Sequence, residues 1–155
     1  MKIVIPEYKT LEVNTLFLDF NGTIAIDGVI PQSVKERLIL LAENFQIFIL
    51  TADTHGTAKD QCEGLPVIVH TFPVGDARFY KKEIVKSTGS KHCVAIGNGR
   101  YDEWMLKEAA LAIAVMDCEG MYGKLIKEAD ICVRSMQDAL DLLLYPSRII
   151  ADLRG

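Results

Sequence analysis

Several features that would point to other classes of protein are missing from this sequence. No apolar run approaches the roughly 20 residues needed to cross a membrane, and residues 1–6 are too short for the hydrophobic region of a signal peptide. The net charge of -4 gives no bulk attraction for nucleic acid or for an anionic membrane surface. We therefore expect a soluble cytoplasmic protein with neither nucleic acid nor membrane as a partner.

Cysteine is sparse and scattered. The four residues are Cys62, Cys93, Cys118 and Cys132. They form neither the close pairs of a zinc site nor the density of a disulfide scaffold, so we expect reduced thiols, most of them buried. The cysteines enter no mechanism proposed from the sequence.

The chain also lacks internal repeats, low-complexity tracts and linkers. Its 155 residues fit one compact domain and are too few for two comfortable ones. We predict a single domain over residues 1–155. Residues 2–6 and 10–13 are expected to form a hairpin at the sheet edge, within an N-terminal piece covering residues 1–13, and residues 146–155 a C-terminal surface extension.

What the sequence does contain is an alternation of short apolar runs with longer stretches of helical periodicity. The expected strands are residues 14–20, 46–51, 66–70, 92–96, 111–115 and 131–133. The expected helices are residues 31–43, 54–63, 77–87, 102–109, 121–128 and 136–144. This order predicts an α/β fold in three layers, a Rossmann-like parallel sheet with helices on both faces.

Polar residues of particular kinds follow the predicted strands. Asp19 ends the run "LFLD", Thr51 ends "FILT", and Asn98 and Asp102 lie in "GNGRYD". The lysines of "FYKKEIVK" open a predicted helix. Because ligands of open parallel sheets bind outside the carboxyl ends of the strands, these residues are candidates for one site.

A carboxylate, a hydroxyl, an ammonium group and further oxygen ligands at one edge suit phosphoryl transfer. Asp19 is placed to act as nucleophile, and Mg²⁺ would neutralise phosphate charge. Lysine and threonine would hold the phosphate oxygens in the transition state. Gly22 would let the backbone turn sharply beside the phosphoryl group.

In these motifs the sequence resembles the haloacid dehalogenase (HAD) superfamily, and most of all the phosphorylation domain of P-type ATPases. The motifs are "DFNGT" (residues 19–23), "ILTADTHGTA" (49–58), "KKEIVK" (81–86) and "GNGRYD" (97–102). The resemblance covers about residues 16–133 and implies an aspartyl-phosphate on Asp19. Aligning "EIVK" with the ATPase segment places Lys81 in the catalytic position.

The resemblance also implies the roles of the site residues. The catalytic residues would be Asp19, Thr51 and Lys81; the phosphate-binding residues would be Gly22, Thr51, Ala52 and Lys81. The Mg²⁺ ligands would be Asp19, the Asn21 carbonyl, Asn98 and Asp102. The ATPase membrane helices and inserted nucleotide-binding domain have no counterpart here, so the resemblance implies no ion transport.

The spacing of the motifs leaves no room for a cap domain. Thr51 follows Asp19 by 32 positions, and Lys81 follows Thr51 by 30. A capless site either takes a bulky or macromolecular phosphorylated substrate or is closed by a second subunit in a homo-oligomer, because a small phosphoester would otherwise stay exposed to water.

Two residues depart from the superfamily pattern. Asn21 stands where its phosphatases usually have an aspartate that acts as general acid and base, so hydrolysis should be slow. Asn98 replaces a carboxylate of the fourth motif, so metal affinity should fall. The sequence therefore predicts a slow Mg²⁺-dependent phosphohydrolase or phosphotransferase; the alternative is a catalytically impaired binding or regulatory module. A response-regulator receiver is disfavoured, because the third predicted strand ends at His70 without an aspartate.

Other polar and aromatic residues leave alternatives open. Asp53 either assists the site or caps a helix, and Lys82 competes with Lys81 as the phosphate ligand. His55 and His70 are read as ordinary hydrogen-bonded or solvated histidines. Arg100, Tyr101 and Trp104 are candidates for substrate contact at the open edge, with simple packing as the alternative for Trp104.

Overall fold

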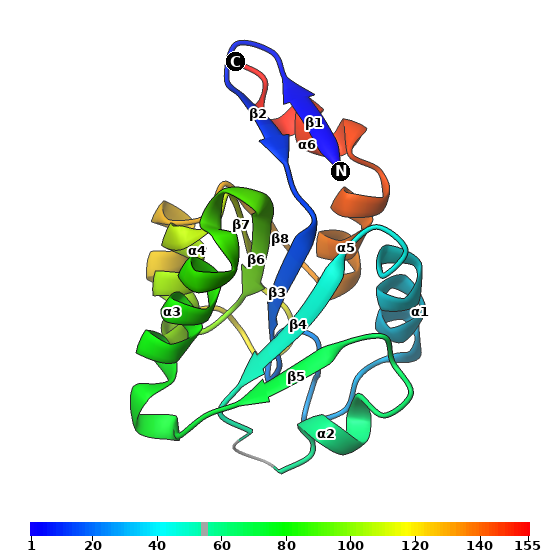
Figure 1. Cartoon of the computed structure of the whole chain (residues 1–155), viewed down its shortest axis with the longest axis vertical. Helices are drawn as coiled ribbons and strands as arrows, with labels where there is room; N and C mark the ends of the chain where they lie inside the picture. The colour runs from blue at the N-terminus through cyan, green and yellow to red at the C-terminus, as the bar shows by residue number, and fades with distance from the viewer. Residues whose placement is uncertain (54–55) are drawn as a thin grey trace.

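A parallel sheet runs through the centre of the computed structural model, which describes residues 1–53 and 56–155. Its strand order is β5-β4-β3-β6-β7-β8, and all neighbouring strands are parallel (Figure 1). The strands are β3 (Thr15–Asp19), β4 (Gln46–Thr51), β5 (Ile68–Thr71), β6 (Cys93–Gly97), β7 (Leu111–Val115) and β8 (Ile131–Val133). The predicted parallel sheet is confirmed.

The central strands are hydrophobic along almost their whole length. All residues of β6 and β7 are buried, and in β3 only Asp19 is partly exposed. Strands that are covered on both faces need such continuous apolar runs. Asp19 is therefore the point at which β3 leaves the core.

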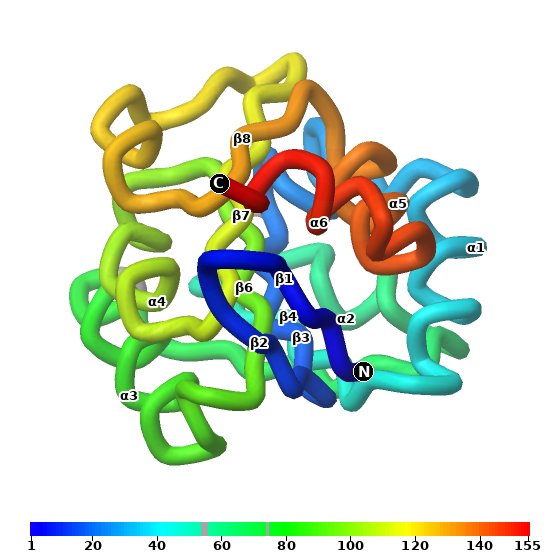
Figure 2. The backbone as a smooth tube through the Cα atoms, turned by 90° about the horizontal axis from the view of Figure 1, so that it is seen from above, coloured from blue at the N-terminus to red at the C-terminus, as the bar shows by residue number. Residues whose placement is uncertain are grey.

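Helices cover both faces of the sheet, as expected. α1 (Gln32–Leu41) and α5 (Met136–Leu144) lie on one face, while α3 (Ala77–Gly89) and α4 (Glu103–Glu108) lie on the other (Figures 1 and 2). In the described part of the chain, none of the helices has the length and apolar character of a membrane span.

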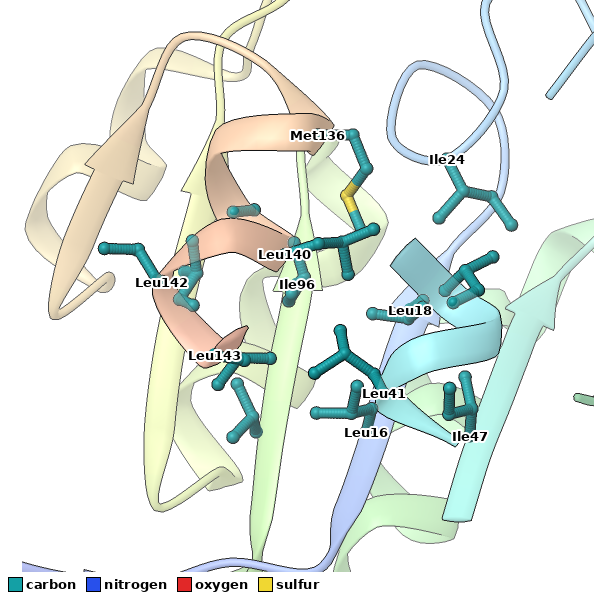
Figure 3. Packing of buried hydrophobic residues seen from close by; sticks show 14 of the residues in the cluster. Leu16, Leu18, Ile24, Leu41, Ile47, Ile96, Met136, Leu140, Leu142 and Leu143 are labelled. Atoms are coloured by element: carbon teal, nitrogen blue, oxygen red, sulfur yellow. The ribbon is translucent and has the colours of Figure 1, made fainter. Parts of the chain in front are cut away.

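Each helical layer closes a hydrophobic core of its own. Figure 3 shows Leu16 and Leu18 of β3 beside Leu41 of α1 and Leu140 of α5. Phe17 points to the opposite face, into the cluster under α3 and α4. Side chains alternate between the two faces along β3, so both layers hold this strand in register.

The two ends of the chain differ from the prediction. β1 (Lys2–Ile5) and β2 (Lys9–Glu12) form the predicted hairpin, but it is a separate two-stranded sheet and not an added edge strand. The C-terminal extension contains a helix, α6 (Ser147–Leu153), which packs near β1. Burial of Ile149 explains why this segment is ordered against the domain.

The helix predicted at 136–144 has the bounds of α5, whereas those predicted at 31–43 and 77–87 are shifted by one or two residues at their ends and the other three differ as follows. In place of the helix expected at 121–128 the structure has the 3-10 segment η4 (Gly123–Lys127), in which only Leu125 is buried, so there is no apolar face to support a longer α-helix. The helix expected at 54–63 is described only as α2 (Ala58–Gln61). The helix expected at 102–109 begins one residue later, because Asp102 ends the 3-10 turn η3 (Arg100–Asp102).

Candidate active site

The carboxyl end of β3 lies where the strand order of the sheet reverses, with β4 on one side and β6 on the other. Open α/β sheets bind ligands at such a point. Asp19 is the last residue of β3, Thr51 is the last residue of β4, and Asn98 follows β6. The structure thus brings together the strand ends that the sequence singled out.

A cavity of about 150 Å³ opens at this edge. At about 30 Å³ for each water molecule, it has the volume of a phosphoryl group with a few waters. Its walls are Asp19, Asn21, Thr51, Ala52, Ala77, Lys81, Asn98, Gly99, Tyr101 and Asp102. Every predicted site residue except Gly22 lines it.

Lys81 supplies the positive charge of the site. It lies in the first half of α3 and is buried, with its ammonium group ion-paired to Oδ1 of Asp19 and, at 2.6 Å, to Oδ1 of Asp102. Lys82, in contrast, lines another depression with Trp104. The geometry therefore favours Lys81 over Lys82 as the residue that faces the cavity.

Two carboxylates and one ammonium group leave this cluster short of positive charge. Burial raises the pKa of Asp19 to about 6; the charge of Asp102 adds to the rise and Lys81 opposes it. Burial lowers the pKa of Lys81, but the two carboxylates outweigh that effect, so its pKa is raised overall. Lys81 therefore stays protonated. A second positive charge near Asp19 would be needed to offset the remaining carboxylate charge.

Asp102 organises the loop after β6. Its Oδ2 accepts hydrogen bonds from the backbone N–H groups of Asn98 (3.0 Å) and Gly99 (2.8 Å), while Oδ1 faces Lys81. A Cβ atom at Gly97 would lie 2.6 Å from Oδ2, so only glycine leaves space for this carboxylate. Both Asp102 oxygens are engaged by the protein, and its role as a metal ligand stays a prediction.

Thr23 links the two motifs that flank the switch point. Its hydroxyl lies 3.1 Å from Oδ2 of Asp19 and 3.2 Å from Oδ1 of Asn98, and the residue is buried. The Asn98 amide nitrogen donates to the Gly120 carbonyl at 3.0 Å, which turns its oxygen toward Thr23. The sequence reasoning assigned Thr23 no role, although the Gly-Thr pair of the first motif was the available signal.

Gly22 permits the close approach of these loops. Its φ is +73°, and a Cβ atom there would overlap the side chain of Asn98. Its N–H donates to the Ala25 carbonyl at 2.9 Å, closing the turn after β3. Gly22 does not itself line the cavity, although Asn98 beside it does, and its contact with phosphate remains a prediction.

Several residues with side-chain oxygen atoms line the cavity beside Lys81. Asp19 contributes a carboxylate and Asn98 an amide oxygen, while Oδ1 of Asn21 is buried without a hydrogen-bond partner in the described chain. Residues 1–53 and 56–155 contain no group of three His, Cys, Asp or Glu side chains suited to a metal. Mg²⁺ is usually bound in proteins by one or two carboxylates and keeps several of its water ligands. One carboxylate with neutral oxygen atoms beside it therefore fits this ion.

On the β4 side, Thr51 is buried and its hydroxyl accepts a hydrogen bond from the Asp53 N–H at 2.8 Å. Oδ1 of Asp53 in turn accepts from the N–H of Ala58, the first residue of α2, at 3.0 Å. This contact supports the helix-cap reading of Asp53. The loop thereby holds Thr51 and Ala52 at the cavity.

Among the remaining candidates, Tyr101 lies at the cavity, and His70 and Trp104 do not line it. The ring of His70 packs against Phe48, with centroids 5.6 Å apart, and His55 lies outside the described residues. Tyr101 lines the cavity, while Trp104 stacks on the guanidinium group of Arg78 at 4.1 Å. Sequence reasoning missed Arg78, since nothing in its local spacing predicts that stack.

No family model matches the chain. Two curated proteins of Methanocaldococcus jannaschii do, neither with a stated activity. "Uncharacterized protein MJ0073" is 45% identical over 73 residues, which cover 47% of this chain and 78% of that protein. "Uncharacterized protein MJ0072" is 59% identical over 39 residues, which cover 25% of this chain and 89% of that protein.

Solved structures share the fold across most of the chain. The 3-deoxy-D-manno-octulosonate 8-phosphate phosphatase of Moraxella catarrhalis, in complex with a magnesium ion, a phosphate ion and a KDO molecule, superposes with a TM-score of 0.72 at 15% identity, and the match covers 92% of this chain and 94% of that one. The cobalt-bound phosphatase of Haemophilus influenzae gives 0.72 at 12% identity, covering 86% and 88%. A HAD subfamily III A hydrolase structure from Legionella pneumophila gives 0.66 at 17%, covering 91% and 87%.

Proposed function

Because the chain belongs to the same family as MJ0073 and has the fold of HAD superfamily phosphatases, we propose that it is a Mg²⁺-dependent phosphohydrolase or phosphotransferase. The observation that carries this proposal is the ion-paired cluster of Asp19, Lys81 and Asp102, in which Lys81 and Asp102 are buried and all three residues line the switch-point cavity. Asp19 would be phosphorylated during turnover. The substrate is a phosphorylated compound, and the capless edge suits a bulky one or closure by a second copy.

Each residue of the cluster and its neighbours has a separate role in the proposed reaction. An Asp19 oxygen attacks phosphorus, Thr23 holds the other oxygen, and Lys81 and Thr51 bind the phosphate oxygens as negative charge shifts onto them. Asp102 keeps Lys81 charged and aimed into the cavity. Mg²⁺, held by Asp19, the Asn21 carbonyl and Asn98, would supply the positive charge that this cluster lacks.

Hydrolysis of the phosphoenzyme is the step that this site supports least. An amide at Asn21 neither takes a proton from the attacking water nor returns one. General acid and base catalysis is worth about a hundred- to ten-thousandfold, so the phosphoenzyme should persist. A lasting phosphoenzyme favours either slow release of phosphate or transfer to another acceptor.

A second candidate is a binding or regulatory module that keeps phosphate recognition without useful turnover. Asn21 and Asn98 favour it, because both replace carboxylates of the superfamily pattern, and the cluster around Lys81 would still bind phosphate. The two candidates differ in whether Asp19 becomes covalently modified.

The test is the intact-protein mass after acid quench, with Mg²⁺ and acetyl phosphate, p-nitrophenyl phosphate or ATP, while released phosphate is counted in the same tubes. We expect an adduct or phosphate release that disappears in Asp19→Asn. Asp152→Asn, an exposed carboxylate on α6, is the matched control and should behave like the wild type. Neither signal with any donor would favour the binding module.

A further inference from the structure

The cavity has no side chain well suited to give a proton to a departing group, within the part of the chain that the structure describes. Asn21 is an amide, and Lys81 is held as a cation between two carboxylates. Asp102 already accepts from Lys81 and two backbone N–H groups. Among the cavity walls, only the phenol of Tyr101 remains as a conceivable donor.

A second cavity, of about 320 Å³, adjoins the first at Tyr101, which lines both. Its other walls include Arg78, Phe79, Arg100 and Trp104. Phe79, Tyr101 and Trp104 are 53%, 47% and 37% exposed as whole residues, so three large aromatic residues lie at the surface here. Such walls suit a planar or delocalised group, which stacks on aromatic rings and on guanidinium planes.

The two arginines give this second cavity hydrogen-bond donors. Arg78 is stacked on Trp104 and paired with Glu103, yet its Nε is buried and has no partner in the described residues. Arg100 is exposed and forms no ion pair within the same residues. Asp76 lines the cavity as well, so the net charge there is small and an anion would be held by directed hydrogen bonds.

We propose that this protein takes its phosphoryl group from donors whose leaving group is stable as an anion, namely phosphoanhydrides, acyl phosphates or aryl phosphates, and that the cavity of Arg78, Arg100 and Tyr101 receives that leaving group. The inference rests on the proposed function. It disfavours alkyl phosphates such as sugar phosphates, whose alkoxide leaving groups need a proton as they depart.

Phosphoryl transfer from such a donor to Asp19 needs no proton donor for the leaving group. The bond between phosphorus and the leaving oxygen breaks, its electron pair stays on that oxygen, and a bond forms from Asp19 to phosphorus. The leaving group departs as an anion beside Arg100. Water later attacks phosphorus, the bond to Asp19 breaks, inorganic phosphate is released and the proton passes to solvent.

The test is the dependence of kcat/KM on leaving-group pKa, in a series of substituted phenyl phosphates of similar size. We expect a steep decline in the wild type as the leaving group becomes more basic. Asn21→Asp should flatten the decline, raising kcat/KM for the poorest leaving group by about a hundredfold or more and for the best one only slightly. Asn44→Asp, the same change in an exposed residue before β4, should keep the wild-type slope.

A flat dependence in the wild type would overturn the inference. A flat dependence that becomes steep in Tyr101→Phe would overturn it too, and would assign proton donation to Tyr101. Both results leave the proposed function standing, because turnover that depends on Asp19 persists. Absence of such turnover with every donor would overturn both.

A second experiment measures kcat/KM for ATP, acetyl phosphate and p-nitrophenyl phosphate in Arg100→Ala, to show which class of leaving group depends on the second cavity. If the second cavity receives the group, kcat/KM should fall by about tenfold or more for at least one donor, and most for the donor that the cavity fits. Arg148→Ala, an exposed arginine beside Tyr145 on α6, is the control and should leave all three unchanged. Equal rates in Arg100→Ala and wild type for all three would overturn the assignment of the cavity.

Discussion

The ammonium group of Lys81 lies 2.6 Å from Oδ1 of Asp102, and the two side chains are 3% and 1% exposed. Lys81 is also ion-paired to Asp19, so its buried charge keeps one carboxylate partner when Asp102 is removed. Asp102 also accepts two backbone hydrogen bonds from the loop after β6. The pair therefore joins the chemistry of the site to the stability of the fold.

Asp102→Ala should lower the free energy of unfolding by about 2–4 kcal/mol, because two backbone N–H groups lose their acceptor while Lys81 keeps Asp19 as an ion-pair partner. Urea denaturation measures the loss. Glu12→Ala removes the partner of Lys2 in an exposed ion pair and should change stability far less. Equal losses in the two variants would show that the Asp102 cluster contributes no special stability.

Gly22→Ala should destabilise the protein more than Gly64→Ala. The two glycines have similar φ values, +73° and +75°, so both substitutions carry strain of about 1–2 kcal/mol. A Cβ atom at Gly64 meets nothing within 4 Å, whereas one at Gly22 overlaps Asn98. The difference between the two midpoints of thermal unfolding isolates that overlap; identical midpoints would mean that the loop moves aside freely.

Asn98→Asp should have opposite effects with and without Mg²⁺. Without the metal, the new carboxylate loses the hydrogen bond to the Gly120 carbonyl and faces that oxygen, which should cost about 1–3 kcal/mol. With Mg²⁺, the added negative charge should tighten metal binding and recover stability. Thermal unfolding with EDTA or with Mg²⁺ measures both effects, and a variant insensitive to Mg²⁺ would exclude residue 98 as a ligand.

Asn21→Asp should shorten the life of the phosphoenzyme. A carboxylate two residues after Asp19 is placed to activate water, and such assistance is worth about a hundred- to ten-thousandfold. The measurement is loss of the phosphoryl adduct with time after the donor is removed. An adduct that decays at the wild-type rate would show that something other than the missing base limits hydrolysis.

The sheet could be read from the sequence because its strands are buried on both faces and appear as continuous apolar runs. The sequence also predicted that Asp19, Thr51 and Asn98 lie close together, because parallel strands end at a common edge of the sheet. The order of the strands and the hydrogen bonds of Thr23 could not, since they depend on which loops meet across the switch point.

Features that depend on packing between segments distant in the sequence could not be predicted either. α6 has only one fully buried residue, Ile149, so its sequence carries little helical periodicity of its own. The hairpin is held by Lys9, which donates to the Ala110 carbonyl and pairs with Asp130, and no local pattern predicts such a contact. The stack of Arg78 on Trp104 is another case, joining α3 to α4.

Both termini of the chain lie beside the hairpin, at the end of the sheet opposite Asp19 (Figure 1). An affinity tag, a fluorescent protein or a surface tether attached at either terminus would thus point away from the mouth of the cavity. The protein can therefore be immobilised through a terminus with the cavity facing solution. Acceptors of the phosphoryl group could then reach the site and be recovered from the support.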